Sequence, residues 1–160
     1  MVLSSVAKGV NQVVIFQLAG EFYGIDIRAV KEIILPLRVT PVPGSSHLIE
    51  GVISLRGQVI PILDLRKKFG FDRLATNKGG RIVVTEVDGL VMGLQVDGVS
   101  EVLRISAQDI EPPPPAVMGS RAGFIGGVAK LDDRLVVILD LTELYRTEDY
   151  QGALDAVAGG

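Results

Sequence analysis

The sequence predicts a mainly β protein whose two halves each form a small barrel of about five short strands. The 160 residues include 22 Val and 14 Ile against 8 aromatic residues, and β-branched side chains suit the pleated surface of a sheet. The chain also repeats itself in order. Each copy contains short apolar runs separated by turn residues, which is typical of small barrels rather than of one open sheet.

The internal repeat is visible at two offsets. Residues 51–65 align without a gap with residues 127–141, at an offset of 76, and seven of the fifteen pairs are identical. At an offset of 69, two more pairs of segments align in the same order: 13–18 with 82–87, and 22–34 with 91–103. Three matches in one order indicate a duplication. Because the offsets differ, the second copy has a longer middle loop, which holds Pro112-Pro113-Pro114-Pro115.

Turn residues predict two hairpins in each copy. The run Val13–Leu18 alternates only in part and leads through a turn into Phe22–Ile27. Asp88-Gly89 occupies the matching place in the second copy, and Asp-Gly between apolar runs is a strong hairpin signal. The four predicted turns are Ala19-Gly20-Glu21, Arg56-Gly57, Asp88-Gly89 and Asp132-Asp133.

A short helix is expected at the end of each copy, after the strands Gln58–Leu63 and Arg134–Leu139. Asp64 and Asp140 follow these strands, where an Asp side chain can accept hydrogen bonds from the free N–H groups of a helix start. The expected helices are Leu65–Phe69 and Leu141–Tyr145.

The repeat predicts subdomains at about residues 13–70 and 81–142, with one strand free to exchange between them. A linker is expected at about residues 72–80, around Asn77-Lys78-Gly79-Gly80. Residues 148–160 offer few apolar anchors and are expected to form a frayed or disordered tail.

Composition excludes several classes of protein. The net charge of −3 and the pI near 5.2 argue against a nucleic-acid-binding protein, which needs clustered Lys and Arg. Without Cys there are no disulfides and no thiolate zinc sites. We find no signal peptide and no apolar run of about 20 residues, so we expect a soluble cytoplasmic chain without membrane insertion.

The sequence contains no recognisable motif for catalysis or metal binding. His47 is the only histidine, and we interpret it as a surface or helix-start residue. Asp64 and Asp140 repeat between the copies, which favours shared helix caps over a catalytic pair. No Gly-rich phosphate loop is present. We therefore expect no catalytic residues, no metal and no cofactor.

Two charged residues remain as candidates. Arg56 stands in a turn where the second copy has Asp132, so it is either a solvated turn cation or an exposed arginine that a rigid hairpin presents to a partner. An internal salt bridge of Arg56 with Glu32 or Glu50 is the remaining alternative. Glu32 is repeated as Glu101, and it is either a structural carboxylate shared by both copies or a binding residue.

Several segments together resemble the CheW family of bacterial chemotaxis adaptors. The resemblance covers about residues 13–144, as a single domain, and its most specific string contains Leu55-Arg56-Gly57 and Pro61. The segments that carry it are Phe22–Ile27, Val30–Ile33, Gly51–Gly57, Val59–Arg66 and Val96–Val102.

The resemblance implies two five-stranded SH3-like barrels and a non-catalytic role. Members link the cytoplasmic tips of chemoreceptors to the histidine kinase CheA, pair with the kinase's regulatory domain, and sit at the inner face of the membrane through receptor arrays. A receptor tip would bind between the barrels. The implied partner-binding residues are Arg56, Glu32, Val30, Val99 and Val102.

Other functions stay open at this point. A paralogous scaffold of a pilus-motility or other receptor-kinase pathway would have the same sequence features. A protein that binds a small ligand in the groove between the barrels, or a nucleic-acid-binding small barrel, fits the composition less well.

Overall fold

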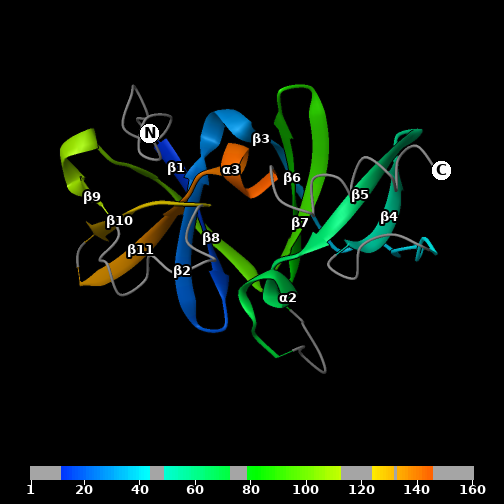
Figure 1. Ribbon diagram of the computed structural model, residues 1–160, viewed down its shortest axis with the longest axis horizontal. Coiled ribbons are helices and arrows are strands. Elements are labelled where there is room, and N and C mark those ends of the chain that lie inside the picture. Colours follow the sequence, from blue (N-terminus) through cyan, green and yellow to red (C-terminus); the bar gives the residue numbers. More distant parts are fainter. Residues whose placement is uncertain (1–11, 44–48, 73–78, 113–123, 132, 146–160) are drawn as a thin grey trace.

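The computed structural model describes residues 12–43, 49–72, 79–112, 124–131 and 133–145, and it is mainly β (Figure 1). The expected mainly β class with short helices and two SH3-like subdomains is confirmed. Five features interpreted from the sequence lie wholly or partly outside these residues: His47, Asp132, most of the linker, Pro113–Pro115 and the tail.

The elements follow the order of the repeat. The first copy contains β1 (Gln12–Leu18), β2 (Glu21–Asp26), the 3-10 turn η1 (Ile27–Ala29), β3 (Val30–Ile34), β4 (Ile49–Leu55), β5 (Gln58–Asp64) and α2 (Leu65–Phe69). The second contains β6 (Arg81–Val87), β7 (Leu90–Val96), β8 (Gly98–Arg104), η2 (Ala107–Asp109), β9 (Ile110–Glu111), β10 (Ile125–Leu131), β11 (Arg134–Leu139) and α3 (Leu141–Tyr145).

Each of the two sheets is assembled from both copies. One has the order β8-β1-β2-β11-β10-β9, and the other has the order β3-β6-β7-β5-β4. The hairpin β1–β2 thus completes the sheet of the second copy, and β6–β7 completes the sheet of the first. The exchange involves a pair of strands from each copy, not the single strand expected. A division of the chain at residues 72–80 would cut both sheets.

Two chain crossovers connect the sheets. The first crossover is Asp26–Ala29, between β2 and β3, and the second is Gln95–Gly98, between β7 and β8. The strand β9 pairs with β10 and gives that sheet six strands, whereas at the matching place of the first copy Thr40 forms only an isolated bridge with Val52 on β4.

The hairpin turns have the backbone that their residues predicted. Ala19-Gly20, Arg56-Gly57 and Asp88-Gly89 all have positive φ at both positions, between 50° and 83°. Two successive left-handed residues match the right-handed twist of the flanking strands, and a glycine at the second position accepts this conformation readily.

The core has three parts. A shared cluster joins both sheets through residues such as Phe16, Val83 and Leu139, and each sheet also has a cluster of its own. Along β1, Val14 and Phe16 face the shared cluster whereas Val13 and Ile15 face the cluster of their own sheet. Burial of both faces explains why this strand alternates only in part.

Both predicted helices begin at an Asp cap. The Asp64 carboxylate accepts hydrogen bonds from the N–H groups of Arg66 and Lys67, and Asp140 accepts one from Glu143. At the end of α3, the fully buried Tyr145 hydrogen-bonds the Thr85 hydroxyl on β6. Tyr145 therefore holds the last helix, which follows one sheet, onto a strand of the other sheet.

Candidate functional site

Arg56 and Glu32 form an ion pair across the open side of the five-stranded sheet. Nη1 of Arg56 donates to one carboxylate oxygen of Glu32 at 2.5 Å, and Nη2 donates to the other at 3.0 Å. Glu32 lies on the edge strand β3, and Arg56 lies in the turn between β4 and β5. No strand pairing joins β3 to β4 among the described residues. The ion pair thus connects the two edges that pairing leaves apart.

The charges of this pair stabilise each other. Hydrogen bonds from Arg56 lower the pKa of the Glu32 carboxyl, and the same contact raises the pKa of Arg56. The Arg56 side chain is 71% exposed, so water screens the pair and its guanidinium keeps access to a partner. The structure thus contains the internal salt bridge with Glu32, and the Arg56 side chain also stays largely exposed.

The second copy contains an equivalent pair. Arg134, the first residue of β11, donates to Glu101 on the edge strand β8. Its guanidinium also lies over the Phe22 ring, 4.7 Å from the centroid. Glu101 matches Glu32 in the repeat, but Arg134 lies two positions beyond the match to Arg56. Both copies thus have an arginine–glutamate pair, although the arginine occupies a different position of the hairpin in each copy.

Exposed apolar side chains recur at matching positions near these pairs in the chain. Ile33 is 40% exposed and Val102, its match in the repeat, is 45% exposed. Val59 is 39% exposed and its match Leu135 is 56% exposed. The first docking set is defined here as Glu32, Ile33, Arg56 and Val59, and the second as Glu101, Val102, Arg134 and Leu135.

The remaining valines predicted to bind partners are less accessible. Val30 opens β3 and Val99 lies in β8, at matching positions of the repeat. Both are half-buried against the shared cluster. Of the three valines, Val102 alone is widely exposed. The five predicted residues thus occupy two edge strands and one hairpin, and they belong to both sheets.

Within the described residues, no three His, Cys, Asp or Glu side chains are grouped to hold a metal ion. In the same part of the chain, no helix has the length and apolar character needed to cross a membrane.

Most of the chain matches a known protein family. A family model described as the CheW-like domain matches residues 12–149. The chain belongs to the CheW-like domain family. The Leu55-Arg56-Gly57 string noted in the sequence forms the turn after β4, and its arginine makes the pair with Glu32.

Two curated CheW proteins and one solved structure are similar to this CheW-like chain over most of their length. The chemotaxis protein CheW of Treponema pallidum is 33% identical over 88% of this chain and 85% of its own. The chemotaxis protein CheW of Bacillus subtilis is 30% identical over 90% and 92%. The crystal structure of the scaffolding protein TtCheW from Thermoanaerobacter tengcongensis matches with a TM-score of 0.79 and 40% identity, over 87% and 94%.

Sequence reasoning missed part of this CheW-like surface. It did not name Ile33, Val59 or Leu135 as exposed, because they lie in runs that read as core strands. It also missed the partner of Glu101. A search for an arginine within two positions of the matched turn would have found Arg134.

Proposed function

We propose that this CheW-like protein is a non-catalytic adaptor that couples chemoreceptors to the histidine kinase CheA. The observation that carries the proposal is the presence of two matching docking sets, one on each sheet, in a family whose members are named chemotaxis and scaffolding proteins. The partners are the cytoplasmic tips of the receptors and the regulatory domain of the kinase. The protein is held at the inner face of the membrane through receptor arrays.

The two-sheet architecture suits an adaptor because it offers separate edges to separate partners. Each docking set combines apolar side chains with an arginine, a residue type enriched in the centres of interfaces. One weak contact on each sheet becomes a stable link when receptors and kinases are held close together, since the second contact forms at high effective concentration. A signal passes if receptor states bind the adaptor with different affinities.

We assign the partner contacts to Arg56, Glu32, Val30, Val99 and Val102. Arg56 supplies the central charged contact, with Glu32 holding its guanidinium in place. The half-buried Val30 and Val99 form the apolar base beside the two edge strands. Because these residues belong to both sheets, one helical receptor tip that reaches across the groove between the sheets can contact most of them.

The proposal is tested by reconstitution. Receptor-containing membranes are mixed with CheA and ATP, and kinase autophosphorylation is measured with and without this protein. We expect the protein to have no phosphorylation activity alone and to raise the activity of the kinase in the presence of receptor. Unchanged kinase activity across a range of receptor ratios, with receptors from both chemotaxis and pilus pathways, would contradict the proposal.

A further inference from the structure

The two crossovers are matched by the repeat but are filled differently. Position 28 matches position 97 at the offset of 69, and position 142 matches position 66 at the offset of 76. The first crossover therefore has Arg28 and Thr142 where the second has Asp97 and Arg66. The second crossover therefore holds two opposite charges, whereas the first holds an arginine and the short hydroxyl side chain of a threonine.

At the second crossover, the Arg66 side chain fills the space between α2 and the crossover segment that contains Asp97. Its Nε and Nη2 donate to the two Asp97 oxygens at 2.8 and 2.7 Å. Both side chains are largely buried. The hydrogen bond to Asp97 is the main cause that raises the pKa of Arg66, and Asp64 at the start of α2 adds attraction. A guanidinium is thus stable in this place.

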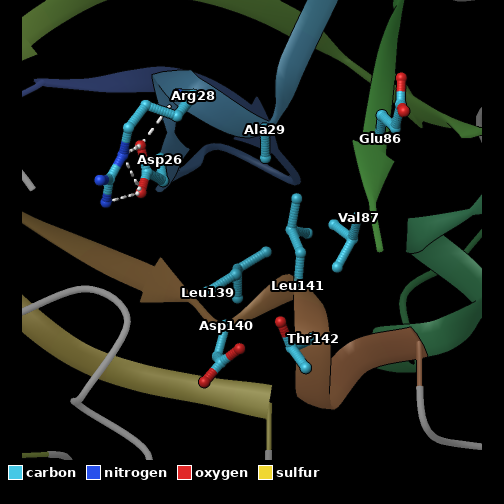
Figure 2. A pocket seen from close by; sticks show the side chains of 9 residues that line it. All are labelled: Asp26, Arg28, Ala29, Glu86, Val87, Leu139, Asp140, Leu141 and Thr142. Atoms are coloured by element: carbon cyan, nitrogen blue, oxygen red, sulfur yellow. Dashed lines mark hydrogen bonds and ion pairs between the residues drawn. The ribbon is translucent and has the colours of Figure 1, made fainter. Parts of the chain in front are cut away.

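At the first crossover, the matching space is a pocket of about 350 Å³ between η1, the end of β6 and the start of α3 (Figure 2). Thr142 is too short to fill it as Arg66 fills its counterpart. The nine lining residues are Asp26, Arg28, Ala29, Glu86, Val87, Leu139, Asp140, Leu141 and Thr142.

The lining combines an apolar wall with excess carboxylates. Ala29, Val87, Leu139 and Leu141 supply the wall, and the charged lining residues are three carboxylates, of Asp26, Glu86 and Asp140, and one guanidinium. That guanidinium, of Arg28, is held by Asp26 through bonds of 2.7 to 3.1 Å, and Figure 2 shows it turned away from Thr142.

The other two lining carboxylates, those of Asp140 and Glu86, also contribute to the charge of the pocket. Asp140 matches Asp64, which attracts the guanidinium at the other crossover. Glu86 also pairs with Lys31 on the outer side, at 3.1 Å. Even with this lysine counted, the surroundings stay acidic. A cation is therefore favoured over an anion here.

We propose that this pocket takes an arginine side chain from a partner protein, in the place that Arg66 fills at the second crossover. The aliphatic stem packs on the apolar wall, and the guanidinium donates to the carboxylates at the rim. That a partner polypeptide supplies the arginine rests on the proposed adaptor function. The binding of the side chain itself does not depend on that function.

The pocket is tested with three uncharged-backbone probes, N-acetyl-arginine amide, N-acetyl-glutamate amide and N-acetyl-leucine amide. Their titrations are followed by amide chemical shifts in the ¹⁵N-labelled full-length protein. We expect the arginine probe to shift Ala29, Val87 and Thr142 along a saturating curve, about tenfold more tightly than the other two. Equal or tighter binding of the glutamate or leucine probe, or no saturating shift, would overturn the proposal.

A double variant provides the matched control. Arg28→Asp with Thr142→Arg recreates both residues of the second crossover and fills the pocket from within the chain. We expect it to fold and to lose the arginine-probe shifts, whereas Thr142→Ser, which keeps the space, retains them. If the double variant still binds the arginine probe, the pocket is not the site.

Kinase coupling separates this inference from the proposed function. We expect the double variant to support less receptor-dependent kinase activity than Thr142→Ser. Full activity of the double variant would overturn the docking of a partner arginine while leaving the adaptor function intact. Failure of the wild-type protein to couple, with the arginine probe still bound, would contradict the adaptor function alone.

Discussion

At the scale of single residues, arginine–carboxylate pairs occupy the places where the backbone makes no bond. Arg56–Glu32 links the two unpaired edges of one sheet, Arg134–Glu101 links β11 to the edge strand β8, with which it is not paired, and Arg66–Asp97 fastens a helix to a crossover. The three differ in exposure. The largely buried Arg66–Asp97 pair contributes most to the fold, whereas the exposed Arg56 is the one best placed to contact a partner.

Arg56→Asp tests the docking role. Because Arg56 is widely exposed, the variant should melt close to the wild type, slightly lower because the introduced carboxylate would repel Glu32. Loss of an interface arginine should weaken receptor or kinase binding roughly thirtyfold. Calorimetry measures the melting and surface plasmon resonance measures the affinity. Arg38→Asp, at another exposed arginine after β3, is the control and should bind normally.

A large fall in the melting temperature of Arg56→Asp with normal affinity would reverse this assignment. It would mean that the pair with Glu32 serves the fold rather than the partner. The charge-swapped double variant, Arg56→Glu with Glu32→Arg, distinguishes the two roles further. It should recover the melting temperature but not the affinity, since the partner would meet a carboxylate in the exposed position.

Asp97 should make the stability depend on pH. Burial opposes its ionisation, but hydrogen bonds from Arg66 and the Ala19 N–H outweigh burial and lower the pKa of Asp97 from the ordinary value of an aspartate. A carboxyl with a lowered pKa in the folded state stabilises the fold above its unfolded pKa and loses this contribution as the pH falls through the folded value. The free energy of unfolding should therefore fall below about pH 4.

Asp97→Asn isolates this effect. The variant should be less stable at pH 7, and its free energy of unfolding should fall less steeply between pH 5 and 2 than that of the wild type. Urea titrations at each pH measure both quantities. Identical pH profiles for the two proteins would show that other carboxyls cause the acid sensitivity.

At the scale of elements, glycines allow two parallel strand pairs to approach closely. Gly24 on β2 lies opposite Ile138 on β11, and Gly93 on β7 lies opposite Ile62 on β5. The two glycines match in the repeat. A Cβ at Gly93 would lie 2.6 Å from an Ile62 methyl group, and at Gly24 the nearest atom would be 3.2 Å away.

Gly93→Ala should therefore destabilise the protein more than Gly24→Ala. Overpacking of a buried cluster costs about 1–3 kcal/mol, and the clash at Gly93 requires movement of side chains that are fully buried. Denaturant unfolding of both variants measures the difference. A Gly93→Ala protein as stable as the wild type would show that the cluster around Ile62 and Ile82 adapts without cost.

The sequence predicted local elements well and the choice of partner strands poorly. Ala19-Gly20 and Arg56-Gly57 specify hairpins through their own backbone preferences, and Asp64 specifies a helix start. These signals act over a few residues. Matching strands of a duplicated chain have nearly the same apolar pattern, so β1–β2 suits the strands of either copy, and the pattern does not distinguish exchange from its absence.

The same reasoning explains the result at the candidate site. Arg56 and Glu32 are 24 residues apart and nothing local links them, so the sequence offered their salt bridge only as an alternative, with Glu50 as the other possible partner. Arg134 was overlooked because its position does not match that of Arg56 in the repeat. Ion pairs between edges depend on how the sheet curves, and curvature is a property of the assembled strands.

At the scale of the whole molecule, reciprocal exchange makes the two sheets one cooperative unit. Each sheet needs a hairpin from the other copy, and the shared cluster joins both. A rigid relation between the sheets follows. It keeps the two docking sets at a fixed spacing, as the proposed adaptor function requires.

Cleavage between residues 72 and 79 tests this unity. The two fragments should remain associated and keep the native circular dichroism, because strand pairs on both sheets join them. Expressed separately, neither fragment should unfold cooperatively, whereas mixing them should restore a single transition. A lone fragment with a cooperative melt would show that one copy can close its own sheet.

The exchange also sets the order of events during synthesis on the ribosome. Phe22 on β2 pairs with Val136 on β11, 114 residues later. At roughly 5–20 residues per second, the first hairpin waits on the order of ten seconds for its neighbour to be made. Contacts so distant along the chain also slow folding itself. The nascent hairpin β1–β2, which is apolar on both faces, is therefore the segment whose apolar surface chaperones must shield longest.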